Sequence, residues 1–279
     1  MAQLTLPQFK QTMKKIIFIL LIAATGFAQK AAVNNLTIGI KENFKSVSLN
    51  ENRPLNIYLP QGYAENPSRT YPVVYLLDGA VNEDFIHIVG VVQFLSMIEK
   101  MPEAIVVGIA NVDRKRDFTF PTTIQKDKID FPTTGSSAKF IDFLENELQP
   151  HITKNYKTNG DKIIVGQSLG GLLATEILIK KPDLFDKYII ISPSLWWDNE
   201  SLLTQIPGSL QKKSKPSKVF IAVGTEGKKM EEDAKILSEK LKALASDNLK
   251  ITFKPMPEET HLTILHNSVY KAFEQLYLK

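Results

Sequence analysis

The strongest constraint on this chain is a series of short apolar runs that alternate with helical segments. Runs of three to five mostly β-branched residues, without polar alternation, predict strands that are buried on both faces, as in a parallel sheet. Strand and helix alternate to the end of the chain, which implies right-handed βαβ crossovers, helices on both faces and a binding site at the carboxyl ends of the strands. The expected strands are residues 73–77, 104–107, 163–165, 188–191, 219–223 and 251–253, and the expected helices are residues 85–98, 138–150, 172–180, 232–244 and 268–278.

The region before these runs has a different pattern. Apolar and polar residues alternate over residues 44–49 and again over residues 54–59, with a turn expected at residues 50–52. This predicts an antiparallel hairpin at the edge of a mostly parallel α/β sheet. The longest irregular segment, residues 111–137, is expected to border a functional site.

The first 28 residues resemble a secretory signal. Lys14 and Lys15 precede an apolar run at residues 16–24, and the small residues Gly26 and Ala28 suit cleavage after Ala28. The run is shorter than the ~20 residues that span a bilayer. We therefore expect a signal peptide at residues 1–28, with Met13 as an alternative start, and one exported domain at residues 29–279, periplasmic or secreted.

Charge and cysteine content exclude several kinds of partner. Lys10, Lys14 and Lys15 lie in the signal region, and removing these three from the 34 basic residues leaves 31 against 30 acidic ones. This balance gives no reason to expect nucleic acid or, after cleavage, a membrane as partner. There is no cysteine, hence no disulfide, thiolate metal site or thiol nucleophile. We expect no metal and no cofactor.

One motif predicts nucleophilic chemistry. Residues 166–170 read Gly-Gln-Ser-Leu-Gly, a G-x-S-x-G pattern between an expected strand and an expected helix, which is the setting of a nucleophile elbow. The turn strains Ser168, and side chains at Gly166 and Gly170 would clash where strand and helix pass closely. The alternative is a glycine-rich turn with an incidental serine. A phosphate loop is excluded because the Gly-Lys-Ser/Thr ending is missing.

A serine nucleophile needs a histidine base, and there are four histidines. His87 and His151 precede Ser168, whereas an elbow of this type orders its triad as serine, acid, histidine. His261 stands just past the last strand and is preferred. His266, before the final helix, is the alternative.

The acid and the oxyanion donors are expected at other strand ends. Glu226 follows the penultimate strand and is the first candidate for the acid, with Asp198 as the alternative. The oxyanion hole is expected to form from the backbone N–H of Leu169 and that of Gly79 or Ala80, which follow the expected strand at residues 73–77.

Together these residues resemble a known family: esterases of the α/β-hydrolase fold related to enterochelin esterases, S-formylglutathione hydrolases and carbohydrate acetyl or feruloyl esterases. The likeness extends from about Phe44 to the end. In that family the histidine shortly precedes a serine or threonine and the closing helix, as His261 precedes Thr263. Some relatives work with little more than a Ser–His pair. The segments that carry the likeness are residues 71–79, 107–117, 166–171, 192–198 and the His261 segment.

The resemblance implies a serine esterase acting through an acyl-enzyme on a small ester, with a siderophore or an acylated carbohydrate as substrate. An acyltransferase of the same fold, or a non-catalytic siderophore or glycan binder, is the alternative. Two groups of residues are candidates for substrate contact. Arg114 and Arg116, beside Lys115, could attract an anionic catecholate or form a solvated surface. Trp196 and Trp197 could wall an aromatic pocket or pack a loop.

Overall fold

The computed structural model describes residues 35–207, 210 and 215–277. Residues 38–279 form one compact unit, which is described by itself. The predicted signal at residues 1–28 and the first residues of the predicted domain, 29–34, lie outside the described residues. Within the described part of the chain, no helix is long and apolar enough to cross a membrane.

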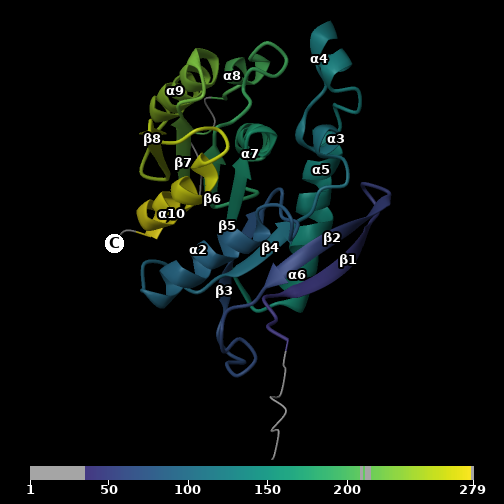
Figure 1. Ribbon diagram of the computed structural model, residues 1–279, viewed down its shortest axis with the longest axis vertical. Coiled ribbons are helices and arrows are strands. Elements are labelled where there is room, and N and C mark those ends of the chain that lie inside the picture. Colours follow the sequence, from purple (N-terminus) through teal and green to yellow (C-terminus); the bar gives the residue numbers. More distant parts are fainter. Residues whose placement is uncertain (1–34, 208–209, 211–214, 278–279) are drawn as a thin grey trace, which may run out of the picture. The chain divides into compact units, whose positions relative to one another are not determined.

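An eight-stranded sheet forms the centre of this unit (Figure 1). The strand order is β1-β2-β4-β3-β5-β6-β7-β8. The pairs β1–β2 and β2–β4 are antiparallel, and all the other pairs are parallel. The strands are β1 Ile40–Ser46, β2 Glu51–Tyr58, β3 Tyr71–Leu76, β4 Ile105–Ile109, β5 Thr158–Gln167, β6 Lys187–Ile191, β7 Ser217–Gly224 and β8 Leu249–Met256.

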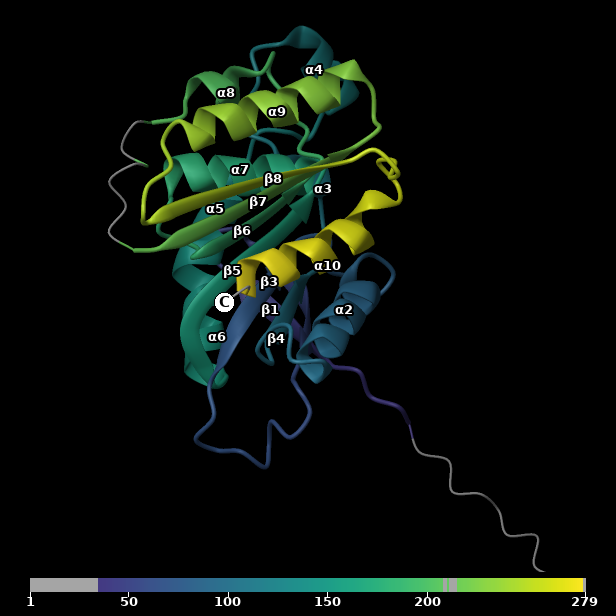
Figure 2. The ribbon, with the colours of Figure 1, turned by 90° about the vertical axis from the view of Figure 1, so that its left-hand side faces the viewer.

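Helices cover both faces of the sheet, as predicted. Figure 2 shows α2 and α10 side by side, with α7, α8 and α9 on the other side of the strands. All five predicted helical segments are present, and three of them begin three or four residues earlier than predicted. The helices are α2 Phe85–Met97, α3 Arg114–Phe118, α4 Gln125–Asp130, α5 Ser137–Asp142, the π-helical η1 Phe143–Leu148, α6 Gln149–Asn155, α7 Leu169–Lys180, α8 Ser201–Thr204, α9 Lys228–Lys242 and α10 Ile264–Tyr277.

The two faces of the sheet explain the unbroken apolar runs. Strand β3 is buried at all six of its positions. Val73 and Tyr75 pack into the cluster beneath α7 and α9, whereas Val74 and Leu76 pack into the cluster beneath α2 and α10. Because successive side chains point to opposite faces, a strand covered on both sides must be apolar throughout.

The N-terminal hairpin is present, but its turn lies earlier than predicted. The turn occupies residues 47–50, and β2 already begins at Glu51. The Glu147 carboxylate accepts hydrogen bonds from the backbone N–H groups of Val47 and Ser48, at 3.0 and 2.6 Å. Asn50 closes the turn with a φ of 52° and a hydrogen bond to Val47 O at 3.1 Å. A contact with a residue about 100 positions away thus sets a turn that local alternation placed wrongly.

The segment 111–137 is also more regular than predicted, because it contains the short helices α3 and α4. Asp113 caps α3 by accepting a hydrogen bond from Arg116 N at 3.1 Å. Such a cap satisfies one of the N–H groups that a helix start leaves without a partner.

Candidate active site

The residues predicted to act together all follow parallel strands, at the carboxyl edge of the sheet. Ser168 follows β5, Glu226 follows β7 and His261 follows β8, while Asp78 and Gly79 follow β3. Non-glycine residues with positive φ gather at this edge: six of the eight in the described residues lie there. They are Asp78, Ser168, Ser192, Asp198, Asn199 and Glu200. Backbone strain of this kind persists where the surrounding structure holds it, and it often marks a functional site.

The turn at Ser168 has the geometry of a nucleophile elbow. Ser168 adopts φ 58° and ψ −118° directly before α7. A Cβ atom at Gly166 would lie 2.3 Å from the backbone oxygen of Gly170, and one at Gly171 would lie 2.9 Å from Ile191 O. A Cβ at Gly170 itself would meet only ordinary contacts, at 3.4 Å or more. The expectation of a clash is therefore confirmed for Gly166 and wrong for Gly170, because the tight helix contact falls at Gly171.

His261 and Glu226 meet across the ends of β8 and β7. His261 Nδ1 lies 2.5 Å from Glu226 Oε2, and the Glu226 side chain is 2% exposed against 40% for His261. The other carboxylate oxygen accepts hydrogen bonds from Ser192 Oγ and, at 2.9 Å, from Gly224 N. Burial would raise the pKa of Glu226, but the hydrogen bonds from His261, Ser192 and Gly224 lower it overall. The carboxylate is thus held charged against the ring nitrogen that a triad acid orients.

The alternative residues have other partners. Asp198 accepts hydrogen bonds from Thr122 Oγ1 and from Thr123 N, at 2.9 and 2.7 Å. His266 Nδ1 lies 3.3 Å from His87 Nδ1, on the face of α2 and α10. His151 Nε2 lies 2.8 Å from a Glu42 carboxylate oxygen. None of these pairs includes Ser168, His261 or Glu226.

Two serines that the sequence analysis missed complete the contacts of this site. Ser192 and Ser194 follow β6 directly. Ser192 Oγ bonds to Glu226, and Ser194 Oγ lies 3.2 Å from Ser168 Oγ. Their place after a parallel strand was the available signal, since all such strand ends meet at this edge.

The expected oxyanion donors differ in their availability. Leu169 is the first residue of α7, so its N–H has no partner four residues earlier in the helix. In contrast, Gly79 N donates to Ile109 O and Ala80 N donates to Glu83 Oε2, both at 2.9 Å. A Cβ at Gly79 would lie 2.4 Å from Gly108 Cα, so this glycine permits contact with β4. Of the three candidates, Leu169 is the one with a free N–H.

The two arginines after β4 are bound to carboxylates of the protein. Arg114 makes a bidentate pair with Asp78, at 2.6 and 2.9 Å, and also donates to Gln167 O at 3.2 Å. Arg116 pairs with Asp117 and Glu51, at 2.7 and 2.9 Å. Arg114 thereby ties the segment after β3 to the residue before Ser168, and the charges of both arginines are locally balanced.

A cleft of about 620 Å³ opens above Ser168. Trp196 lines it together with Met230 and Leu262, and Leu262, beside His261, is 92% exposed. Trp197 is fully buried, and its Nε1 donates to Phe120 O at 2.9 Å. The two tryptophans thus take the two roles weighed for them: Trp196 walls the cleft and Trp197 packs the loop.

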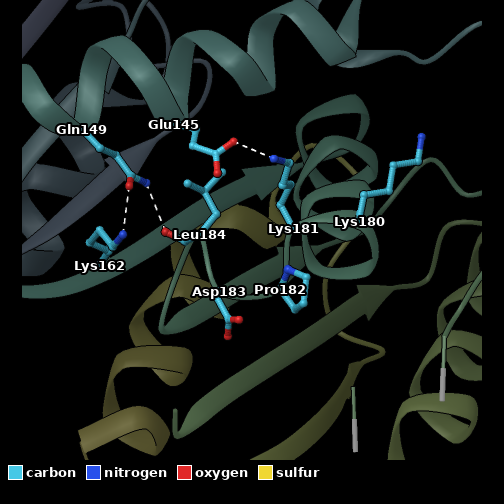
Figure 3. Close-up of a pocket in the computed structure, with 8 residues that line it drawn as sticks. All are labelled: Glu145, Gln149, Lys162, Lys180, Lys181, Pro182, Asp183 and Leu184. Atoms are coloured by element: carbon cyan, nitrogen blue, oxygen red, sulfur yellow. Dashed lines mark hydrogen bonds and ion pairs between the residues drawn. The ribbon is translucent and has the colours of Figure 1, made fainter. Parts of the chain in front are cut away.

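A second cavity, of about 430 Å³, lies near the amino ends of β5 and β6, at the opposite edge (Figure 3). Lys162 and Leu184 line it and are both bonded to the Gln149 side chain, while Lys181 pairs with Glu145 at 2.9 Å. None of the predicted site residues lines this cavity. Within the described residues, no group of three or more His, Cys, Asp or Glu side chains could hold a metal ion.

Comparison with known proteins shows the family of the chain. The family described as "Putative esterase" matches residues 46–261. The chain belongs to this esterase family. It is a carboxylic ester hydrolase of the α/β-hydrolase type, as its resemblance predicted.

Individual relatives of this esterase cover most of its length. It is 31% identical over 265 residues to the ferri-bacillibactin esterase BesA of Bacillus subtilis, covering 86% of this chain and 90% of the relative. An IroE-like serine hydrolase from Shewanella oneidensis superimposes with a TM-score of 0.79 at 34% identity, covering 86% of this chain and 80% of that one. The BES protein from Bacillus cereus superimposes with a TM-score of 0.78 at 27% identity, covering 91% and 100%.

Proposed function

We propose that this esterase hydrolyses its ester through an acyl-enzyme on Ser168. The observation that carries the proposal is the assembly at one edge of the sheet: a strained serine at a helix amino end, and a histidine whose Nδ1 lies 2.5 Å from a buried carboxylate. Glu226 holds His261 in the tautomer whose Nε2 is free to accept a proton.

In the first step, His261 Nε2 takes the hydroxyl proton of Ser168 while Oγ attacks the ester carbonyl. The oxyanion receives a hydrogen bond from Leu169 N, strengthened by the positive end of the α7 dipole. His261 then gives the proton to the leaving alcohol, and the acyl group stays on Ser168. Water, deprotonated by His261, attacks this ester, and Ser168 Oγ regains the proton as the acid leaves.

For the substrate we propose a siderophore ester that carries an aromatic ring. Two observations support it: the long match to an esterase named for ferri-bacillibactin, and the cleft wall of Trp196, Met230 and Leu262, which suits a flat ring. The balanced charges of Arg114 and Arg116 argue that ring contacts contribute more than attraction to an anion.

A fluorophosphonate probe followed by peptide mapping tests the mechanism, with one label expected at Ser168. An unlabelled folded protein contradicts it. Catecholate trilactones with and without iron, feruloyl sugars and acetylated xylan oligomers, each assayed against Ser168→Ala, test the substrate. Faster turnover of an acetylated sugar than of every aromatic ester contradicts the siderophore proposal and leaves the mechanism intact.

Acyl transfer and ester binding without turnover are the two alternatives to hydrolysis. Acyl transfer would use the same acyl-enzyme, and adding a competing alcohol separates it from hydrolysis because a transferase forms the new ester in preference to the acid. A non-catalytic binder would bind ester without turnover. Release of p-nitrophenol from p-nitrophenyl acetate by the wild type, lost in Ser168→Ala, contradicts the binder.

We also propose that the protein is exported, with cleavage after Ala28. The support is the sequence pattern alone: Lys14-Lys15, the apolar run and the small residues. Amino-terminal sequencing of the protein from its native host is expected to begin at Gln29. An intact amino terminus in the cytoplasmic fraction contradicts export.

A further inference from the structure

Two buried serines on one loop contact opposite ends of the proposed triad. Ser192 and Ser194 are 0% and 2% exposed, although serine is mostly found at the surface. They follow β6, which lies in the sheet between β5, the strand before Ser168, and β7, the strand before Glu226. Buried hydroxyl groups normally have a hydrogen-bond partner, and here both partners belong to the site.

Ser194 holds the nucleophile at two points. Its N–H donates to Ser168 O at 3.0 Å, and its Oγ lies 3.2 Å from Ser168 Oγ. In the described part of the chain, Ser194 is the side chain that shares a hydrogen bond with Ser168 Oγ. One residue therefore fixes both the main chain and the hydroxyl of Ser168.

Ser192 holds the acid. Its φ of 43° is a strained value for a residue with a side chain, and its N–H donates to Ala222 O in β7 at 2.8 Å. In this conformation Ser192 Oγ donates to Glu226 Oε1, while Oε2 faces His261 Nδ1. The carboxylate is thus oriented by a donor on each oxygen.

We propose that the segment Ser192-Pro193-Ser194 is a positioning element that sets both ends of the triad. Ser192 orients the Glu226 carboxylate, and Ser194 donates a hydrogen bond to Ser168 Oγ as the hydroxyl proton leaves for His261. Before attack either serine hydroxyl can be the donor. Once His261 has taken the proton, Ser168 Oγ can only accept, so Ser194 becomes the donor to the developing charge. No bond to Ser194 is made or broken. The proposal rests on Ser168 being the nucleophile.

A packing role for the same segment predicts a different outcome. Pro193 Cα would lie 2.9 Å from a Cβ at Gly171, so the loop packs closely on α7. If Ser192 and Ser194 only fill space, removing one oxygen from either changes stability without changing the pH dependence or the rate of attack on Ser168.

The experiment measures the rate constant of fluorophosphonate labelling as a function of pH for wild type, Ser192→Ala and Ser194→Ala. Ser217→Ala is the matched control, because Ser217 is 2% exposed but lies at the amino end of β7. Thermal unfolding of each variant verifies that it is folded. Labelling of the wild type tests the proposed function, and the ratios between variants test the positioning element.

We expect Ser194→Ala to label about tenfold more slowly at every pH, as for a lost hydrogen bond to a developing charge. We expect Ser192→Ala to shift the acid-side loss of labelling to higher pH, because the Ser192 hydrogen bond helps to keep the pKa of Glu226 low. Among the described residues, His261 is the charged side chain that contacts this carboxylate, and the Glu231 carboxylate accepts a hydrogen bond from the backbone N–H of Glu226. Ser217→Ala is expected to match the wild type. If Ser194→Ala is labelled with the wild-type rate constant, the proposed role of Ser194 is overturned. If Ser192→Ala loses labelling at the same acidic pH as the wild type, the proposed role of Ser192 is overturned.

Discussion

The two cavities at opposite edges of one sheet differ in how their polar groups are held. Among the residues that line the cleft at the carboxyl edge, Ser168 has positive φ. The side chain of Glu226, the proposed acid, is 2% exposed and has both oxygens bonded. At the amino edge, none of the eight lining residues has positive φ, and Lys181 and Glu145 form an ion pair with side chains 51% and 34% exposed. Strain and buried charge, rather than the presence of a hollow, distinguish the edge to which we assign the chemistry.

The first test of this contrast is to remove Ser168, the proposed nucleophile. We expect Ser168→Ala to reduce kcat for p-nitrophenyl acetate by about 10⁴-fold or more, since a hydroxyl that forms the covalent intermediate has no substitute. Steady-state kinetics at pH 7.5 measure the change. Residual activity above one hundredth of the wild type would place the reactive group elsewhere.

The second change tests the close packing beneath Ser168. Gly166→Ala puts a Cβ 2.3 Å from Gly170 O, so we expect a loss of about 2–3 kcal/mol in the free energy of unfolding, together with lower activity. Gly90→Ala is the matched control, because a Cβ there meets nothing within 4 Å in the interior of α2. The Gly90→Ala variant should have a free energy of unfolding higher by up to about 1 kcal/mol. Urea denaturation measures both, and equal effects would contradict the assigned clash.

The third change compares ion pairs at the two edges. Arg114→Lys loses the bidentate geometry with Asp78 and the bond to Gln167 O, because an ammonium cannot reproduce a planar fork. Since the elbow and the neighbouring loop then lose their common anchor, we expect kcat to fall about tenfold. Lys181→Ala, at the amino edge, should leave kcat unchanged and have little effect on the free energy of unfolding, because its ion pair with Glu145 is exposed to solvent. A rise in KM alone for Arg114→Lys would instead indicate substrate contact.

The smallest effect concerns pH. The folded-state pKa of Glu226 lies below its ordinary value of 4.5, because hydrogen bonds outweigh burial. The unfolded chain therefore binds more protons, so this carboxylate contributes stability above pH 4.5 that is lost as pH falls through the folded pKa. We expect Glu226→Gln to lower the free energy of unfolding at pH 7 and to flatten its acid-side decline. Parallel declines in variant and wild type would contradict the low pKa.

Local pattern predicted most of the fold and part of the site. Unbroken apolar runs gave the parallel strands, since a strand covered on both faces has no polar side, and the chain order placed Ser168, Glu226 and His261 at one edge. Local pattern could not predict the long-range contacts. The Glu147 carboxylate accepts a hydrogen bond from the hairpin turn, and the backbone N–H of Gly79 donates to Ile109 O. The partners of Ser192 and Ser194 also depend on distances that spacing does not encode.

The position of β8 in the sheet has a consequence for folding. It is an edge strand paired with β7 alone, it is the last strand of the sheet along the chain, and His261 lies in the segment between β8 and α10. A partly folded chain can therefore complete the strands around Ser168 and still lack His261, the proposed base, so we expect hydrolysis to begin only after β8 has docked. During refolding, catalytic activity should return with the slowest folding phase, after the far-ultraviolet circular dichroism signal has largely recovered. The enzyme's own turnover would then report the final step of its folding.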